Sequence, residues 1–97
     1  MTEFAFEWDP KKALANRRKH RVSFDEASTV FDDEWAVNYD DEDHSRAEAR
    51  EILVGFSRLG RLLIVSFTKR RQNFRIISAR LATKNERRTH EKPESDS

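Results

Sequence analysis

Residues 74–91, with the sequence FRIISARLATKNERRTHE, decide the fold because they begin as a β-strand and end as a helix. The alternation of side chains in the first half predicts a strand. On one face this strand carries Phe74, Ile76, Ser78 and Arg80. Arg80 is then the last residue of that face, at a point where a buried strand more often carries an aliphatic side chain.

A helix is predicted directly after this strand, because Thr83 and Glu86 have the spacing of a capping box. Its segment KNERRTHE has no apolar face, so burial cannot hold it in place. The free N–H groups of a helix N-terminus attract phosphate, and a neighbouring arginine binds phosphate oxygens in two places. Arg80 is therefore a candidate phosphate ligand. The alternative is that Arg80 pairs with Glu86 or with an acidic residue of 40–43 and only ties the surface together.

Four further segments have apolar patterns that predict β-strands. They are FAFEW at 4–8, WAVNY at 35–39, REILVGFSR at 50–58 and RLLIVSFT at 61–68. Gly60 supplies the unusual backbone angle of a tight hairpin between the last two.

Two helices are predicted between the first two strands. Asp9 is a good N-cap for the first helix, and Ser23 with Glu26 forms a capping box for the second. Asn16 and His20 lie one turn apart on the same face of the first helix. We therefore expect an α+β fold with an antiparallel sheet of three to five strands, two N-terminal helices and one C-terminal helix, all against one sheet face.

Length and composition agree with one small domain over residues 1–92, followed by a polar, disordered tail at 93–97. The chain contains no cysteine, so thiolate metal sites and disulfides are excluded. No apolar run reaches the roughly 20 residues of a membrane span, and the N-terminus does not resemble a signal peptide. We expect a cytoplasmic protein that does not bind a membrane.

The net charge of +1 hides a division along the chain, because acidic residues dominate 32–51 and Lys and Arg dominate 58–92. A basic part of this kind favours a polyanion partner such as nucleic acid, although a solvated charged surface is the commoner explanation. The acidic run DDEDH at 40–44 lacks the glycine and spacing of a calcium loop. We expect no metal and no cofactor.

Metal-free RNA cleavage needs a proton acceptor, a cation against the developing phosphorane charge and a proton donor for the leaving oxygen. Arginines such as Arg80 can supply the cation. The acceptor and the donor can come from His20, His90 or Glu86.

Three blocks of the sequence resemble the BrnT toxins of bacterial type II toxin–antitoxin systems. They are FEWDPKKALANRRKHRVSFDEASTVFDD, GFSRLGRLLIVSFT and RIISARLATKNERR. The resemblance implies a RelE/ParE-like fold, ribonuclease activity that inhibits translation, and a cognate antitoxin that neutralises the toxin and represses their shared operon. Two positions depart from the family pattern, which has glycine where this chain has Arg21 and tyrosine where it has His90. If the glycine marks a left-handed C-cap, Arg21 adopts that conformation at a cost of about 1 kcal/mol.

From the residues and this resemblance together we expect two groups of site residues. The catalytic candidates are Arg80, His20, Glu86, His90 and Arg50. The candidates for RNA binding are Lys19, Arg61, Arg75, Arg87 and Arg88.

The expected partners are RNA and an antitoxin of the ribbon-helix-helix type, similar to BrnA, in a hetero-oligomer that reaches operator DNA only through the antitoxin. Two other functions fit the same residues. One is a module that binds RNA or the ribosome without cleavage, and the other is a co-repressor scaffold for a DNA-binding partner. Binding and cleavage use the same arginines, so the sequence does not separate them.

Overall fold

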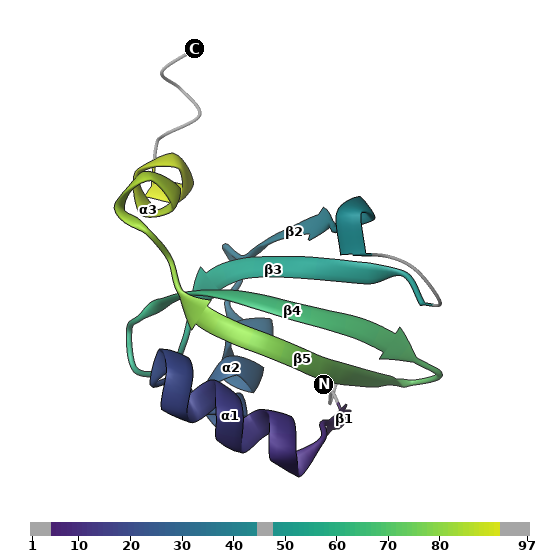
Figure 1. The fold of residues 1–97 in the computed structure, drawn as a ribbon. Coiled ribbons are helices and arrows are strands. Elements are labelled where there is room, and N and C mark those ends of the chain that lie inside the picture. The colour runs from purple at the N-terminus through teal and green to yellow at the C-terminus, as the bar shows by residue number, and fades with distance from the viewer. Residues whose placement is uncertain (1–4, 45–47, 92–97) are drawn as a thin grey trace.

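The structure, a computed structural model, describes residues 5–44 and 48–91, and in these residues five strands form one sheet (Figure 1). The strands are β1 (Ala5–Glu7), β2 (Val37–Asp40), β3 (Arg50–Phe56), β4 (Leu62–Arg70) and β5 (Asn73–Leu81). The α-helices are α1 (Pro10–His20), α2 (Phe24–Thr29) and α3 (Lys84–Glu91), and two short 3-10 helices are η1 (Val30–Asp32) and η2 (Glu42–His44). The predicted disordered tail at 93–97, and Phe4 of the first predicted strand, lie outside the described residues.

The strand order is β1-β5-β4-β3-β2, and β1 runs parallel to β5 whereas the other neighbours are antiparallel. The expectation of a purely antiparallel sheet is therefore wrong at this edge. Hairpins join antiparallel strands, but a parallel strand needs a long crossover. Here α1 and α2, together with the rest of the sheet, separate β1 from β5 along the chain, which gives β1 the freedom to enter beside the last strand.

The main core lies between the sheet and the two N-terminal helices, which cover one face of the sheet in Figure 1. It contains four side chains from the α2 region and six from the strands, with aromatic rings packed around them. Phe31 of η1 meets the rings of Phe6 and Phe67 edge to face, with centroids 4.9 and 5.0 Å apart. Such rings remove a large apolar area from water, which compensates for the low apolar content of the chain.

The last helix does not join the other two, so the prediction that all helices cover one face is wrong. Figure 1 shows α3 on the opposite side of the sheet from α1 and α2. There the ring of His90 meets the ring of Phe56 edge to face at 5.8 Å. The reason lies in the sequence of α3, which is described throughout and buries none of its side chains. A helix without an apolar stripe has nothing to contribute to the main core.

A β-bulge in β5 overturns the predicted alternation of that strand. Ser66 of β4 pairs with Ser78 and Phe67 pairs with Ile76, so the register skips Ile77. Before the bulge, Ile76 faces the helices and is 1% exposed. After the bulge, Arg80 pairs with a residue of the second apolar cluster, and its side chain lies on the face opposite to Ile76.

Several local predictions are confirmed, whereas β1, β2 and β3 each lack end residues that the sequence assigned to them. The side chain of Asp9 accepts a hydrogen bond from the N–H of Lys11 at 2.9 Å, and Gly60 has φ of +79° in the hairpin. The predicted strand at 35–39 begins only at Val37. Trp35 lies in the turn before it, with 79% of its surface exposed.

Candidate functional site

Two adjoining hollows lie on the sheet face opposite α1 and α2, and Arg80 lines both of them. The first, of about 360 Å³, lies between α3 and the sheet and includes Glu86 and His90. The second, of about 420 Å³, includes His20 and Arg50. The five residues predicted as catalytic candidates therefore surround one region of the surface, although they come from four different elements.

Arg80 makes a two-pronged ion pair with Glu86. Its Nη1 and Nη2 atoms each lie 2.8 Å from one of the two carboxylate oxygens, and Nη1 also donates to the carbonyl of Leu81 at 3.2 Å. The pairing that the sequence offered as the alternative to phosphate binding is thus present. The hydrogen bonds from Arg80, together with the N–H of Thr83, lower the pKa of Glu86 to about 2.

The capping box of α3 is complete. The N–H of Thr83 donates to Glu86 Oε1 at 2.8 Å, and the N–H of Glu86 donates to Thr83 Oγ1 at 3.2 Å. Oε1 of Glu86 therefore serves both the cap and the pair with Arg80. Because the guanidinium is bound to the carboxylate that caps the helix, the position of Arg80 and the start of α3 depend on each other.

Further contacts at the other end of α3 involve Phe56. The guanidinium carbon of Arg87 lies 5.8 Å from the centroid of its ring, and Arg87 also pairs with Glu91 at 3.4 Å. Exposed contacts of this kind contribute at most about 1 kcal/mol each. The helix α3, which forms one wall of the first hollow, is therefore held in place by a few exposed contacts and not by buried apolar side chains.

His20 reaches the second hollow because Asn16 fixes the end of α1 beside β5. The Nδ2 atom of Asn16 donates to the carbonyls of Ala79 at 2.7 Å and Val22 at 3.0 Å, and its Oδ1 accepts the N–H of Ala79 at 3.0 Å. The side chain is 7% exposed. Since β1 pairs only with residues 73–75, Asn16 takes the place of a neighbouring strand farther along β5. Sequence reasoning placed Asn16 and His20 on one helix face but did not find this role.

The helix α1 is capped by Arg21, whose φ of 59° is the left-handed conformation expected from the glycine of the family pattern. Its N–H donates to the carbonyl of Arg17 at 2.9 Å. A residue other than glycine in this conformation costs about 1 kcal/mol. The Arg21 carbonyl in turn accepts a hydrogen bond from Nη2 of Arg61 at 3.0 Å.

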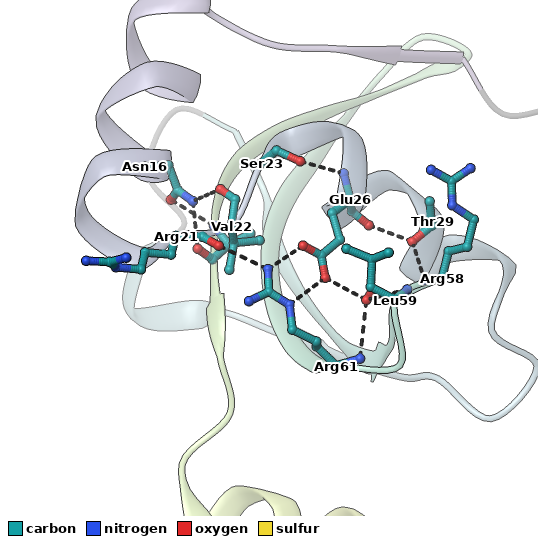
Figure 2. A network of polar contacts seen from close by, with 11 residues as sticks. Asn16, Arg21, Val22, Ser23, Glu26, Thr29, Arg58, Leu59 and Arg61 are labelled. Atoms are coloured by element: carbon teal, nitrogen blue, oxygen red, sulfur yellow. Dashed lines mark hydrogen bonds and ion pairs between the residues drawn. The ribbon is translucent and has the colours of Figure 1, made fainter.

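Figure 2 shows that Arg61 belongs to a network of polar contacts centred on Glu26, whose side chain is buried. Its Nε donates to Glu26 Oε2 at 2.9 Å and its Nη2 donates to Oε1, while Ser57 Oγ donates to Oε2 at 2.7 Å. The hydrogen bond from Arg61 lowers the pKa of Glu26. Only half of the predicted capping box forms, because Ser23 accepts the Glu26 N–H whereas the Glu26 carboxylate turns to the hairpin. The Arg61 guanidinium thus has intramolecular partners, away from both hollows.

The other basic candidates are distributed around the surface. Arg75 pairs with Glu7 at 3.3 Å and lies in one cross-strand row with Thr68 and Arg50. The exposed candidates are Lys19 at the end of α1, and Arg87 and Arg88 on α3. The expected RNA contacts of these residues stay predictions.

The acidic loop does not gather metal ligands. His44 Nδ1 lies 3.0 Å from Asp41, and within residues 5–44 and 48–91 no three His, Asp or Glu side chains are placed to hold an ion together. None of the helices in that part of the chain has the length and apolar character to cross a membrane.

Comparison with known proteins identifies the family. Residues 8–86 match the family described as the ribonuclease toxin BrnT of type II toxin–antitoxin systems. The fold is similar to the 1.1 Å crystal structure of the Brucella abortus ribonuclease toxin BrnT, with a TM-score of 0.65, 20% sequence identity, and coverage of 84% of this chain and 100% of that chain. No curated protein matches the sequence. The structural likeness supports the fold, and the family match covers most of the chain. This chain therefore belongs to the BrnT family of ribonuclease toxins of type II toxin–antitoxin systems.

Proposed function

We propose that this chain is a cytoplasmic endoribonuclease of RelE/ParE-like type, which cleaves RNA without a metal ion and thereby stops translation. One observation carries the proposal: His20, Arg50, Arg80, Glu86 and His90 line two adjoining hollows on one sheet face. Cations next to groups that can transfer protons are what cleavage of a phosphodiester requires.

In the proposed reaction the 2′-oxygen attacks the adjacent phosphorus. The O2′–P bond forms, the P–O5′ bond breaks, a base takes the 2′-hydroxyl proton and an acid protonates the leaving 5′-oxygen. Arg80 and Arg50 stabilise the extra negative charge on the phosphorane. While Arg80 is bound to it, Glu86 has a pKa of about 2, so at neutral pH it enters the reaction ionised and without a proton to donate. The donor is therefore His20 or His90, and the candidate acceptors are the other histidine and Glu86.

Phosphate reaches Arg80 by exchange with Glu86. Both are oxyanions that a guanidinium binds through two parallel hydrogen bonds, so the exchange replaces one charged partner with another. The apolar surroundings of the first hollow then strengthen the new interaction. Lys19, Arg61, Arg75, Arg87 and Arg88 are proposed to hold the RNA backbone farther from the reacting phosphate.

A type II system includes a protein antitoxin. We propose a ribbon-helix-helix partner similar to BrnA, which forms a hetero-oligomer with this chain, neutralises it and represses their operon. Ribbon-helix-helix proteins bind DNA through their own strands. Operator DNA is then bound through the antitoxin and not by this chain.

The test compares Arg80→Ala with Arg58→Ala, which removes an exposed arginine in the β3–β4 hairpin away from both hollows. Expression of the unaltered chain should arrest growth, and the neighbouring antitoxin gene should restore it. Arg80→Ala should lower the cleavage rate by about 10²–10³. Arg80→Lys should rescue only part of the loss, because a point charge cannot make a two-pronged contact. Arg58→Ala should remain toxic.

Three results would count against the proposal. A folded and fully toxic Arg80→Ala protein would mean that Arg80 serves only in an ion pair with Glu86 on the surface. Cleavage that EDTA abolishes and a divalent ion restores would refute the metal-free mechanism. If the protein bound RNA tightly and primer extension detected no cleavage, the chain would be a non-catalytic binding module instead.

A further inference from the structure

The first hollow has an apolar floor that phosphate chemistry does not explain. Its floor comes from the strands β2, β3 and β4, and its wall from β5 and α3. The lining residues are Tyr39, Ile52, Val54, Ile64, Arg80, Asn85, Glu86, Thr89 and His90. A phosphate needs donors and cations, whereas this floor offers three aliphatic side chains and one aromatic ring.

The sheet register shows how these side chains form one continuous surface. Tyr39 of β2 is directly opposite Ile52 of β3, and in the next row Val54 is opposite Ile64, which is opposite Arg80. The surface therefore runs from an aromatic ring at one edge to a guanidinium at the other. Tyr39 lies on the edge strand and is 51% exposed, so its ring is available to a ligand.

We propose that this hollow binds one unstacked nucleobase of a single-stranded RNA, with Tyr39 as the side chain on which the base stacks. The inference rests on the proposed function, because it takes the phosphate of the same strand to be bound at Arg80. A nucleobase has the two properties that the hollow matches, a flat apolar face and a polar edge. The second hollow then holds the backbone on the side of Arg50, His20 and Arg80, away from the carboxylates of Asp41 and Asp43 that also line it.

The position of α3 favours a single strand. This helix lies across the hollow from the apolar floor, and its residues Asn85, Thr89 and His90 line the space that the base would occupy. In an A-form duplex each base is stacked and paired, so it could not enter a space between a helix and a sheet. Single-stranded segments or loops are the class of RNA that fits.

The polar edge of the base would face Asn85 and Thr89. An asparagine amide offers both donors and an acceptor, and such groups distinguish one base edge from another. The Thr89 hydroxyl donates to the backbone carbonyl of Asn85 at 3.0 Å, so the Thr89 Oγ1 atom can still accept a hydrogen bond from a base. We therefore assign the base preference of the site to Asn85, and the base-independent affinity to Tyr39.

The test uses short RNA strands that are methylated at the 2′-oxygens to prevent cleavage and carry one 2-aminopurine. Binding to the unaltered chain should change the fluorescence of the 2-aminopurine at one position of the strand. Tyr39→Ala should weaken binding about 5- to 150-fold, the range for loss of one stacked base, and should abolish the fluorescence change. Tyr39→Phe should bind normally, because the ring is retained. Asn85→Ala should reduce the difference in affinity between strands that differ only in that base.

The matched control is Trp35→Ala, which removes an aromatic ring that is 79% exposed just before the same edge strand and lies outside the hollow. Its affinity should stay within twofold of the unaltered chain. Thermal unfolding of each variant checks that β2 still pairs.

The failures of the two proposals are distinguishable. If Tyr39→Ala binds normally, or an abasic strand binds as tightly as the intact strand, the base subsite is wrong although cleavage by the unaltered chain still supports the proposed function. If Tyr39→Ala loses only the antitoxin and retains RNA, the hollow is a protein-docking surface and the inference is also overturned. If the unaltered chain neither binds nor cleaves RNA, both proposals are wrong.

Discussion

Asn16 should be among the most sensitive positions of this chain, although it lies outside the predicted catalytic group. Replacement by alanine removes three hydrogen bonds, to the carbonyl and N–H of Ala79 and to the carbonyl of Val22. At about 1 kcal/mol for each bond, the free energy of unfolding should fall by about 3 kcal/mol. For a domain of this size the melting temperature should fall by about 12–24 °C.

Asn16→Asp is the sharper variant, because it changes the shape of the side chain very little. It keeps an acceptor for the N–H of Ala79 but places a carboxylate oxygen against two carbonyl oxygens. A buried charge opposite acceptors is destabilising, so this variant should unfold at least as easily as Asn16→Ala at neutral pH. Protonation of the aspartate restores one donor, so the gap to the unaltered chain should narrow as the pH falls.

The assay is urea unfolding followed by circular dichroism, with Asn38→Ala as the control. Asn38 is exposed and its amide donates to Glu51 at 2.6 Å, so its loss should change stability by no more than about 0.5 kcal/mol. In the fraction of Asn16→Ala that remains folded, RNA cleavage should also fall, because His20 loses its anchor. A loss of stability below 1 kcal/mol would refute the idea that Asn16 replaces a neighbouring strand.

Three other predictions follow from the contacts around the hairpin and α3. Glu86 has a folded-state pKa of about 2, below its ordinary value of 4.5, so its stabilisation of α3 should be complete above pH 4.5 and lost as the pH falls through 2. Hydrogen exchange of the α3 amides should become faster over this pH range, and Glu86→Gln should remove the transition. Gly55→Ala should cost about 1–3 kcal/mol in urea unfolding, because the added Cβ would lie 2.8 Å from the Cβ of Ala36, as well as 2.8 Å from a carboxylate oxygen of Asp33; an unchanged midpoint would contradict this. Arg61→Ala should cost about 3 kcal/mol by leaving the Glu26 carboxylate buried without its cation, and the additional change Glu26→Gln should recover part of that loss.

The local features of the fold could be predicted because each has a signal a few residues long. The caps by Asp9 and Thr83 and the hairpin at Gly60 depend on side chains that satisfy nearby backbone groups. The left-handed residue at position 21 was indicated by the glycine of the family pattern. These features form in the same way wherever the segment lies in the fold.

The arrangement of the elements could not be predicted in this way, because it depends on contacts between distant segments. The skipped residue Ile77 has an ordinary β-strand side chain, so the bulge leaves no mark in the sequence. Its consequence is large, since it moves Arg80 to the face that carries the hollows. The parallel pairing of β1 with β5 and the side of the sheet on which α3 lies likewise depend on contacts between distant segments.

The candidate site could be proposed from the sequence as a set of residue types, but its geometry could not. Arg80, Glu86 and His90 are close in sequence, and their ionisable side chains made them candidates together. His20 lies near these residues because Asn16 holds the end of α1 beside β5. In the sequence, Asn16 looks like any other polar side chain of a helix. A buried asparagine that bonds to a strand backbone becomes visible only when the strand edge is known.

The pair between Arg80 and Glu86 is compatible with both interpretations of the arginine, and their difference lies in what RNA must displace. As a surface tie, the pair would be stabilising by itself, yet both side chains are more than a third exposed and such pairs contribute little. What raises its importance is the second bond of Glu86, to the N–H of Thr83. A phosphate that takes the guanidinium leaves the carboxylate on the helix cap, so the exchange does not unfold α3. On the proposed function, the same carboxylate would then lie close to the bound phosphate, and the repulsion between them would weaken the binding of substrate and product alike.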